Sequence, residues 1–127
     1  MGSGNDILDM YIYETNTLLE QLETIVLEAE KADTFSQENV NEIFRIMHTI
    51  KGSSAMMEFD SLTTVAHRIE DMFFIIQEGT MDVVKEEDRP ALFDVVFQSI
   101  DFFRGEVEKV ESGEPLDKDI DSFMANI

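Results

Sequence analysis

The apolar residues of this chain repeat with the period of an α-helix almost from one end to the other. Four long segments show this spacing, at about residues 6–32, 37–57, 61–78 and 90–112, and no segment shows the alternation of a half-buried strand. Each amphipathic helix must bury one face, and short connections make consecutive helices neighbours. We therefore predict an all-α fold, an antiparallel up-and-down four-helix bundle with a short fifth C-terminal helix.

The predicted helix ends carry residues that suit those places. Ser36 and Asp60 precede the second and third helices, where a short polar side chain can accept a backbone N–H. Gly79 is expected as the C′ residue of the third helix, and Pro90 suits the first turn of the fourth. The connection over residues 80–88 is the longest and carries mixed charge.

A fifth, shorter helix is expected after Gly113 and Pro115 close the fourth. Asp117 would cap it. Its apolar residues repeat at i, i+3, i+4 and i+7, which predicts a stripe that docks on the bundle. The members of this stripe are Ile120, Phe123, Met124 and Ile127.

The apolar stripes of the four long helices predict the core. With ten Phe, eight Met and no Trp, that core should be aromatic and aliphatic, with flexible Met side chains filling irregular gaps. The residues expected to face inward are Leu8, Tyr11, Leu18, Leu22, Ile25, Val26, Ala29, Val40, Ile43, Phe44, Met47, Ile50, Leu62, Val65, Ala66, Ile69, Met72, Phe73, Ile76, Leu92, Val96, Ile100, Phe103, Val107 and Val110.

Charge and composition exclude several classes of function. The net charge of −19 repels nucleic acids and anionic membrane surfaces, so we expect neither as a partner. The absence of cysteine excludes a disulfide framework, a thiolate nucleophile and a cysteine zinc site. No apolar run could span a bilayer and no secretory signal is visible, so we expect no membrane insertion and a cytoplasmic location.

The length of 127 residues suits one domain with one core. Residues 1–4, Met-Gly-Ser-Gly, are interpreted as an artificial leader. Residues 5–127 are interpreted as a single domain, which we expect to be a fragment of a longer protein.

His48, in the second predicted helix, has an unusual neighbourhood. At 3.6 residues per turn, Lys51 and Gly52 lie on the same side of the helix as His48. Glycine in a helix interior costs about 1 kcal/mol relative to alanine, and no packing reason for Gly52 is evident. We infer that the space beside the imidazole is needed because something large approaches it.

His67 and Glu70 share a face of the third predicted helix, at i and i+3. The second and third helices are joined by a tight turn near residues 59–60 and must be neighbours. His48 lies about 11 residues before that turn and Glu70 about 10 after it, so the two come level across the helix pair. We expect Glu70 to reach the His48 ring, with His67 one turn nearer the connection.

This grouping has a specific chemistry. A carboxylate that accepts the Nδ1 proton of His48 fixes the tautomer and leaves Nε2 as the nucleophile. Lys51 would favour an incoming phosphoryl group electrostatically. Taken singly, these residues have ordinary explanations, such as a helix-edge histidine or a solvated Glu70. Together they predict a histidine that is phosphorylated at Nε2.

The motif around His48 resembles the signature of histidine phosphotransfer (HPt) domains. It is also similar to the narrower group formed by the N-terminal phosphotransfer domains of CheA-type chemotaxis histidine kinases. The residues that carry the resemblance are Phe44-Arg45-x-x-His48-Thr49-Ile50-Lys51-Gly52-Ser53, the preceding Asn41-Glu42-Ile43, and His67-x-x-Glu70 followed by Phe73-Phe74 and Gly79. The resemblance covers roughly residues 7–125, and it departs locally at residues 53–59, where many members have a Gly-rich stretch.

The resemblance implies that His48 is the phosphoacceptor and Glu70 its hydrogen-bond partner, with Lys51 and His67 completing the polar cluster. It further implies docking of partners beside Gly52 and Arg45. The expected partners are the kinase ATP-binding domain, which phosphorylates His48, and response-regulator receiver domains, whose aspartate receives the phosphoryl group.

The chain has no Gly-rich nucleotide loop, so we expect no cofactor in this domain. ATP and Mg are expected to be used by the separate kinase domain. The fragment is therefore a carrier domain rather than an enzyme by itself, and it is expected to be a monomer.

Other interpretations remain open at this point. The chain could be an HPt domain of a phosphorelay outside chemotaxis, or a non-catalytic adaptor bundle whose acidic surface recruits a basic partner. A carboxylate-rich metal bundle is disfavoured because the His-x-x-Glu pair occurs once, in the reverse order to that of di-iron bundles.

Overall fold

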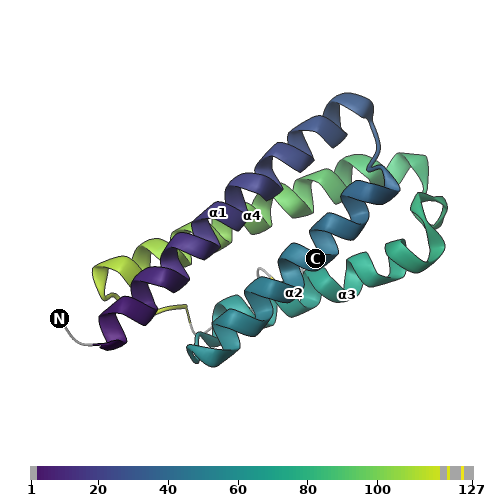
Figure 1. Cartoon of the computed structure of the whole chain (residues 1–127). Coiled ribbons are helices and arrows are strands. Elements are labelled where there is room, and N and C mark those ends of the chain that lie inside the picture. The colour runs from purple at the N-terminus through teal and green to yellow at the C-terminus, as the bar shows by residue number, and fades with distance from the viewer. Residues whose placement is uncertain (1–2, 118–119, 121–123, 125–127) are drawn as a thin grey trace.

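The computed structural model describes residues 3–117, 120 and 124, and these residues form helices and no strand (Figure 1). The all-α class predicted from the apolar spacing is confirmed. The helices are α1 (Ser3–Ala32), α2 (Gln37–Met56), α3 (Asp60–Gly79) and α4 (Arg89–Ser112), with two short 3₁₀ helices, η1 (Met81–Val83) and η2 (Glu86–Asp88), in the connection between α3 and α4.

The four long helices form two packed pairs. α2 packs mainly on α3, and α1 packs mainly on α4; the ribbons of α1 and α4 lie side by side (Figure 1). This arrangement fits an up-and-down bundle. The antiparallel sense of the whole bundle stays a prediction. None of the helices over the described range is long and apolar enough to cross a membrane.

The expected fifth helix falls mostly outside the described residues, as do two members of its stripe, Phe123 and Ile127. Leu116, Ile120 and Met124 do pack against the core. The backbone N–H of Met124 donates to the carbonyl of Ile120 at 2.8 Å, which is one helical turn. The helix as a whole stays a prediction.

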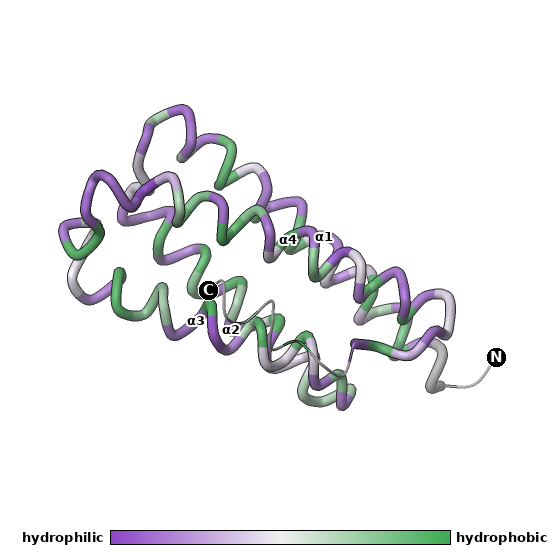
Figure 2. The backbone as a smooth tube through the Cα atoms, turned by 180° about the vertical axis from the view of Figure 1, so that it is seen from behind, coloured by the Kyte–Doolittle hydropathy of each residue, from purple (hydrophilic) through white to green (hydrophobic). Residues whose placement is uncertain are grey.

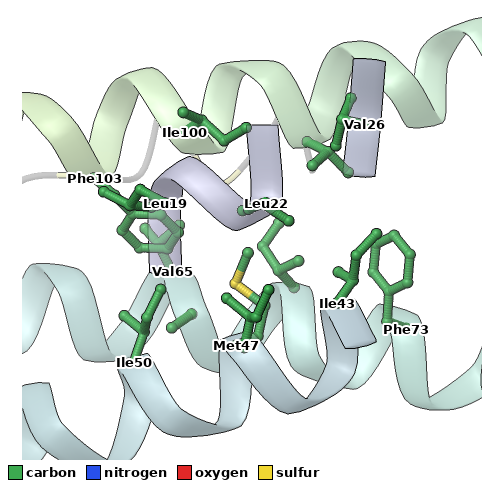
Figure 3. Close-up of a cluster of buried hydrophobic side chains, with 14 of the residues drawn as sticks. Leu19, Leu22, Val26, Ile43, Met47, Ile50, Val65, Phe73, Ile100 and Phe103 are labelled. Atoms are coloured by element: carbon green, nitrogen blue, oxygen red, sulfur yellow. The ribbon is translucent and has the colours of Figure 1, made fainter. Parts of the chain in front are cut away.

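The core lies between the two helix pairs, where the apolar stripes meet (Figure 3). Apolar and polar stretches follow one another along the helices, as Figure 2 shows, which is the pattern of amphipathic helices. The core includes Leu19 and Ile46, which the predicted stripes left out and which are 0% and 1% exposed. The burial is wider than one narrow stripe because each helix packs against more than one neighbour. The predicted core residues that are only half-buried are Leu8, Leu18, Ile25, Phe44, Met72 and Val110.

Three of the predicted helix ends are correct. Ser36 caps α2, its hydroxyl accepting the backbone N–H of Asn39 at 3.1 Å. Gly113 ends α4 in the left-handed conformation, at φ +79°, and Pro90 lies in the first turn of that helix.

Two other predicted ends are wrong. Asp60 is the first residue of α3, not its cap; Phe59 takes that place and makes no side-chain capping bond. Gly79 is the last residue of α3, and Thr80 adopts the positive φ, at +59°. Glycine suits position 79 for a different reason: a Cβ there would lie 2.2 Å from Cγ1 of Val83 in η1, so the Val83 side chain would have to shift.

The end of α2 that follows His48 is tied to α1. The hydroxyls of Tyr11 and Ser54 form a buried hydrogen bond of 2.8 Å. The Tyr11 ring also meets Phe59 edge-on, with ring centroids 5.2 Å apart. These contacts hold the last turn of α2 and the turn into α3, which together set the relative height of residues on the two helices.

Candidate functional site: a histidine held across the α2–α3 pair

His48 of α2 and Glu70 of α3 meet across the helix pair, as counting from the common turn predicted. His48 Nδ1 lies 2.5 Å from Glu70 Oε2. The His48 side chain is 65% exposed, whereas that of Glu70 is 7% exposed. A buried carboxylate therefore holds one side of an imidazole whose remainder faces solvent.

Lys51 binds the second oxygen of the same carboxylate. Its Nζ donates to Glu70 Oε1 at 2.6 Å, and its side chain is 28% exposed. Burial of the Glu70 carboxyl raises its pKa, but the hydrogen bonds and positive charges of Lys51 and His48 outweigh that effect. The pKa of Glu70 therefore lies below its ordinary value of 4.5.

The ionised carboxylate determines the tautomer of the His48 ring. An ionised Glu70 can only accept hydrogen bonds, so Nδ1 must carry the proton between them. In the neutral ring Nε2 then keeps its lone pair. The arrangement can do what the sequence pattern predicted: present a nucleophilic ring nitrogen and stabilise positive charge that develops on the ring.

His67 lies beside this group without bonding to His48. Its nearest ionic partner is Asp71, one turn further along α3, with Nε2 3.5 Å from Oδ2. Sequence reasoning missed Asp71, although its i, i+4 spacing from His67 was a usable signal. The predicted role of His67 in the polar cluster stays a prediction.

His67, Glu70 and Asp71 could in principle hold a metal ion, because one ligand atom from each lies within 4.8 Å of the others. Both oxygens of Glu70, however, already accept hydrogen bonds from His48 and Lys51. A metal would share the carboxylate with these two donors, and its charge would oppose those of Lys51 and a positively charged His48 ring, so the geometry favours the histidine–carboxylate interpretation of Glu70.

Gly52 lies in open space, one turn beyond His48. A Cβ built at Gly52 would meet no atom within 4 Å, so packing within this chain does not require glycine there. Arg45 is exposed and forms an ion pair with Glu42, one turn back on α2. The predicted docking roles of Gly52 and Arg45 stay predictions.

Comparison with known proteins agrees with this geometry. The sequence matches the family model of the Hpt domain over residues 6–112. It is 30% identical over 123 residues to the chemotaxis protein CheA of Bacillus subtilis, covering 97% of this chain and 17% of that protein. It is 29% identical to CheA of Treponema pallidum over 128 aligned positions, covering 100% of this chain and 15% of that protein.

CheA of Halobacterium salinarum is 25% identical over 123 residues, covering 97% of this chain and 18% of that protein. The chain thus spans less than a fifth of the length of these curated relatives. The family match covers all of α2, α3 and α4 and most of α1, and so includes every element that builds the His48 site. The chain therefore belongs to the Hpt domain family.

Proposed function

We propose that this chain is the phosphoryl-carrier domain of a CheA-type chemotaxis kinase. The observation that carries the proposal is the exposed His48 ring held at Nδ1 by the buried Glu70 carboxylate. Membership of the Hpt family and similarity to CheA proteins of three organisms support it.

Both transfer steps use the same nitrogen. In the first, the lone pair of His48 Nε2 attacks the γ-phosphorus of ATP, the bond from that phosphorus to the bridging oxygen breaks, and ADP leaves. Nδ1 keeps its proton, so the phosphorylated ring is positively charged and Glu70 stabilises it. In the second, an aspartate oxygen of a receiver domain attacks the phosphorus, and the P–N electron pair returns to Nε2.

Lys51 would help in both steps through its charge. Its ammonium group lies on the same side of α2 as His48 and is partly exposed. A phosphoryl group on Nε2 brings negative charge to this end of the cluster, and a nearby cation lowers the energy of that charge. Gly52 and Arg45 would border the surface on which the partner's active site docks.

We propose further that ATP and Mg are bound by a separate kinase domain of the full-length protein. This chain spans less than a fifth of its CheA relatives, so there is ample room for such a domain. The carrier would act in the cytoplasm, where ATP and receiver domains are available.

The test is a phosphorylation assay with mapping of the modified residue. The chain is incubated with a CheA kinase domain, ATP and Mg, and the modified peptide is identified by mass spectrometry under alkaline conditions. Acid-labile phosphate is expected on His48. The variant H48Q should take up none, whereas H67Q should still be labelled at His48. Equal labelling of H48Q and the wild type would end the proposal.

A further inference from the structure

A second aromatic ring accompanies the His48 imidazole. Phe44, one turn earlier on α2, lies nearly parallel to it, with ring centroids 6.4 Å apart and 14° between the planes. Phe74 of α3 tilts against Phe44, with centroids 6.1 Å apart and 43° between the planes. Phe44 is half-buried and packs against the core, whereas Phe74 is 50% exposed, so the middle ring of the row is the one anchored in the bundle.

The bond to Glu70 restrains the imidazole at one atom only, Nδ1. A hydrogen bond tolerates a range of donor angles, so the ring plane can still rock by small rotations about the Cβ–Cγ bond. The χ2 torsion of histidine is broad and does little to resist this rocking. The lone pair of Nε2 lies in the ring plane, so any rocking of that plane changes the direction in which Nε2 attacks.

A parallel neighbour opposes this rocking. Offset-stacked aromatic pairs are favourable at centroid separations of 4.5–7 Å, the range in which Phe44 and His48 lie. Phe44 can serve as a fixed reference because its own position is set by core packing and by Phe74. Sequence reasoning placed Phe44 on the buried stripe of α2 and in the motif around His48, but gave it no role toward the His48 ring.

We propose that Phe44 is a positioning residue for His48: its ring, braced by Phe74, holds the imidazole plane so that the Nε2 lone pair points in one direction. The inference rests on the proposed phosphoryl-carrier function. Phe44 touches no phosphoryl group and acts only through the histidine. Glu70 and Phe44 thus have different roles: the carboxylate sets the tautomer of the imidazole, and the phenyl ring sets the orientation of the imidazole plane.

The experiment measures uptake of phosphoryl groups from phosphoramidate, a small donor that needs no docking surface. Nε2 attacks its phosphorus, the P–N bond of the donor breaks, and ammonia leaves. F44L removes the flat ring while keeping an apolar side chain, and F44Y restores the ring. F97L is the matched control, because Phe97 is also half-buried against the core but lies on α4.

We expect F44L to take up phosphoryl groups about two- to tenfold more slowly than the wild type, the factor that a lost aromatic pair represents. F44Y and F97L should match the wild type. In F44L the ¹H chemical shifts of the His48 ring should also move, because the ring current of Phe44 is gone. F74L, at an exposed position of α3, should slow uptake in the same direction and tests the brace even where F44L fails to fold.

Two outcomes separate this inference from the function on which it rests. If the wild type is labelled at His48 and F44L is labelled equally fast, Phe44 has no positioning role but the carrier function stands. The same holds if F44Y is as slow as F44L, since that pattern reports packing rather than the ring. A wild-type chain that takes up no phosphoryl group from either donor refutes the carrier function itself.

Discussion

Replacing Glu70 should slow phosphoryl uptake far more than it disturbs the fold. In E70A, both His48 and Lys51 lose their acceptor, at 2.5 and 2.6 Å. Both can turn to water, because their side chains are 65% and 28% exposed. No buried donor is left unpaired, so the loss of stability should be about 1.5–2 kcal/mol, the lower part of the range for bonds to charged groups.

The effect on rate follows from the same bond. A hydrogen bond to a charged group contributes about 1.5–3 kcal/mol, and its full loss in the transition state corresponds to about a 10- to 150-fold slower reaction. E70Q should take up phosphoryl groups as slowly as E70A. Its amide N–H can donate to the ring, which favours the opposite tautomer, with the lone pair on Nδ1 and the proton on Nε2.

Two measurements test this reasoning. A quenched time course of labelling with a CheA kinase domain and ATP gives the rate of phosphoryl uptake, and ¹⁵N NMR of the His48 ring gives the tautomer. E38A serves as the control, since it also removes one carboxylate from the pair of helices but at an exposed position of α2. If E70Q keeps the wild-type rate and the Nδ1–H tautomer, Glu70 does not orient the histidine.

Three further predictions concern pH, the open space and the end of α4. Because folding lowers the pKa of Glu70, the contribution of its carboxylate to the free energy of unfolding is fully present above pH 4.5 and is lost as pH falls through the folded pKa. The difference in free energy of unfolding between the wild type and E70Q, measured in urea, should therefore shrink below pH 4.5. G52Q should keep or raise stability, by up to about 1 kcal/mol, yet slow transfer to a receiver, whereas G105Q, at an equally open helix position, should leave transfer unchanged. Equal transfer rates would show that the space is incidental. E106A should destabilise the bundle by about 1–3 kcal/mol without slowing labelling, because the Glu106 carboxylate is 1% exposed and accepts the backbone N–H of Asp117, beyond α4, at 3.1 Å. The control E108A, at an exposed position, should change neither stability nor labelling. Thermal unfolding monitored by circular dichroism checks both stabilities.

Much of the fold could be predicted because helix formation is local. The apolar spacing fixed the class, and each long helix begins and ends within about three residues of its expected place. Ser36 and Gly113 were predictable because a cap depends on a residue and its nearest neighbours. The surroundings of Gly79 were not predictable, because they depend on where the Val83 side chain of η1 lies against the end of α3.

The pairing of His48 with Glu70 was also within reach of the sequence, for a geometric reason. Two helices joined by a tight turn have a common origin, so residues at equal distances from that turn come level. The chemistry of the pair then follows from the residue types alone. The family match confirms the kind of domain that this pattern indicated.

Only the tertiary structure decided how the site is shared among side chains. That Lys51 takes the second oxygen of Glu70, and that Phe44 lies parallel to the imidazole, depend on rotamers and on the rotation of each helix about its axis. Periodicity locates a residue on a face to within a wide arc, whereas a hydrogen bond or a ring contact requires placement within a few tenths of an ångström. That difference in scale is why the sequence determined which residues meet and the packed bundle determined what each one does there.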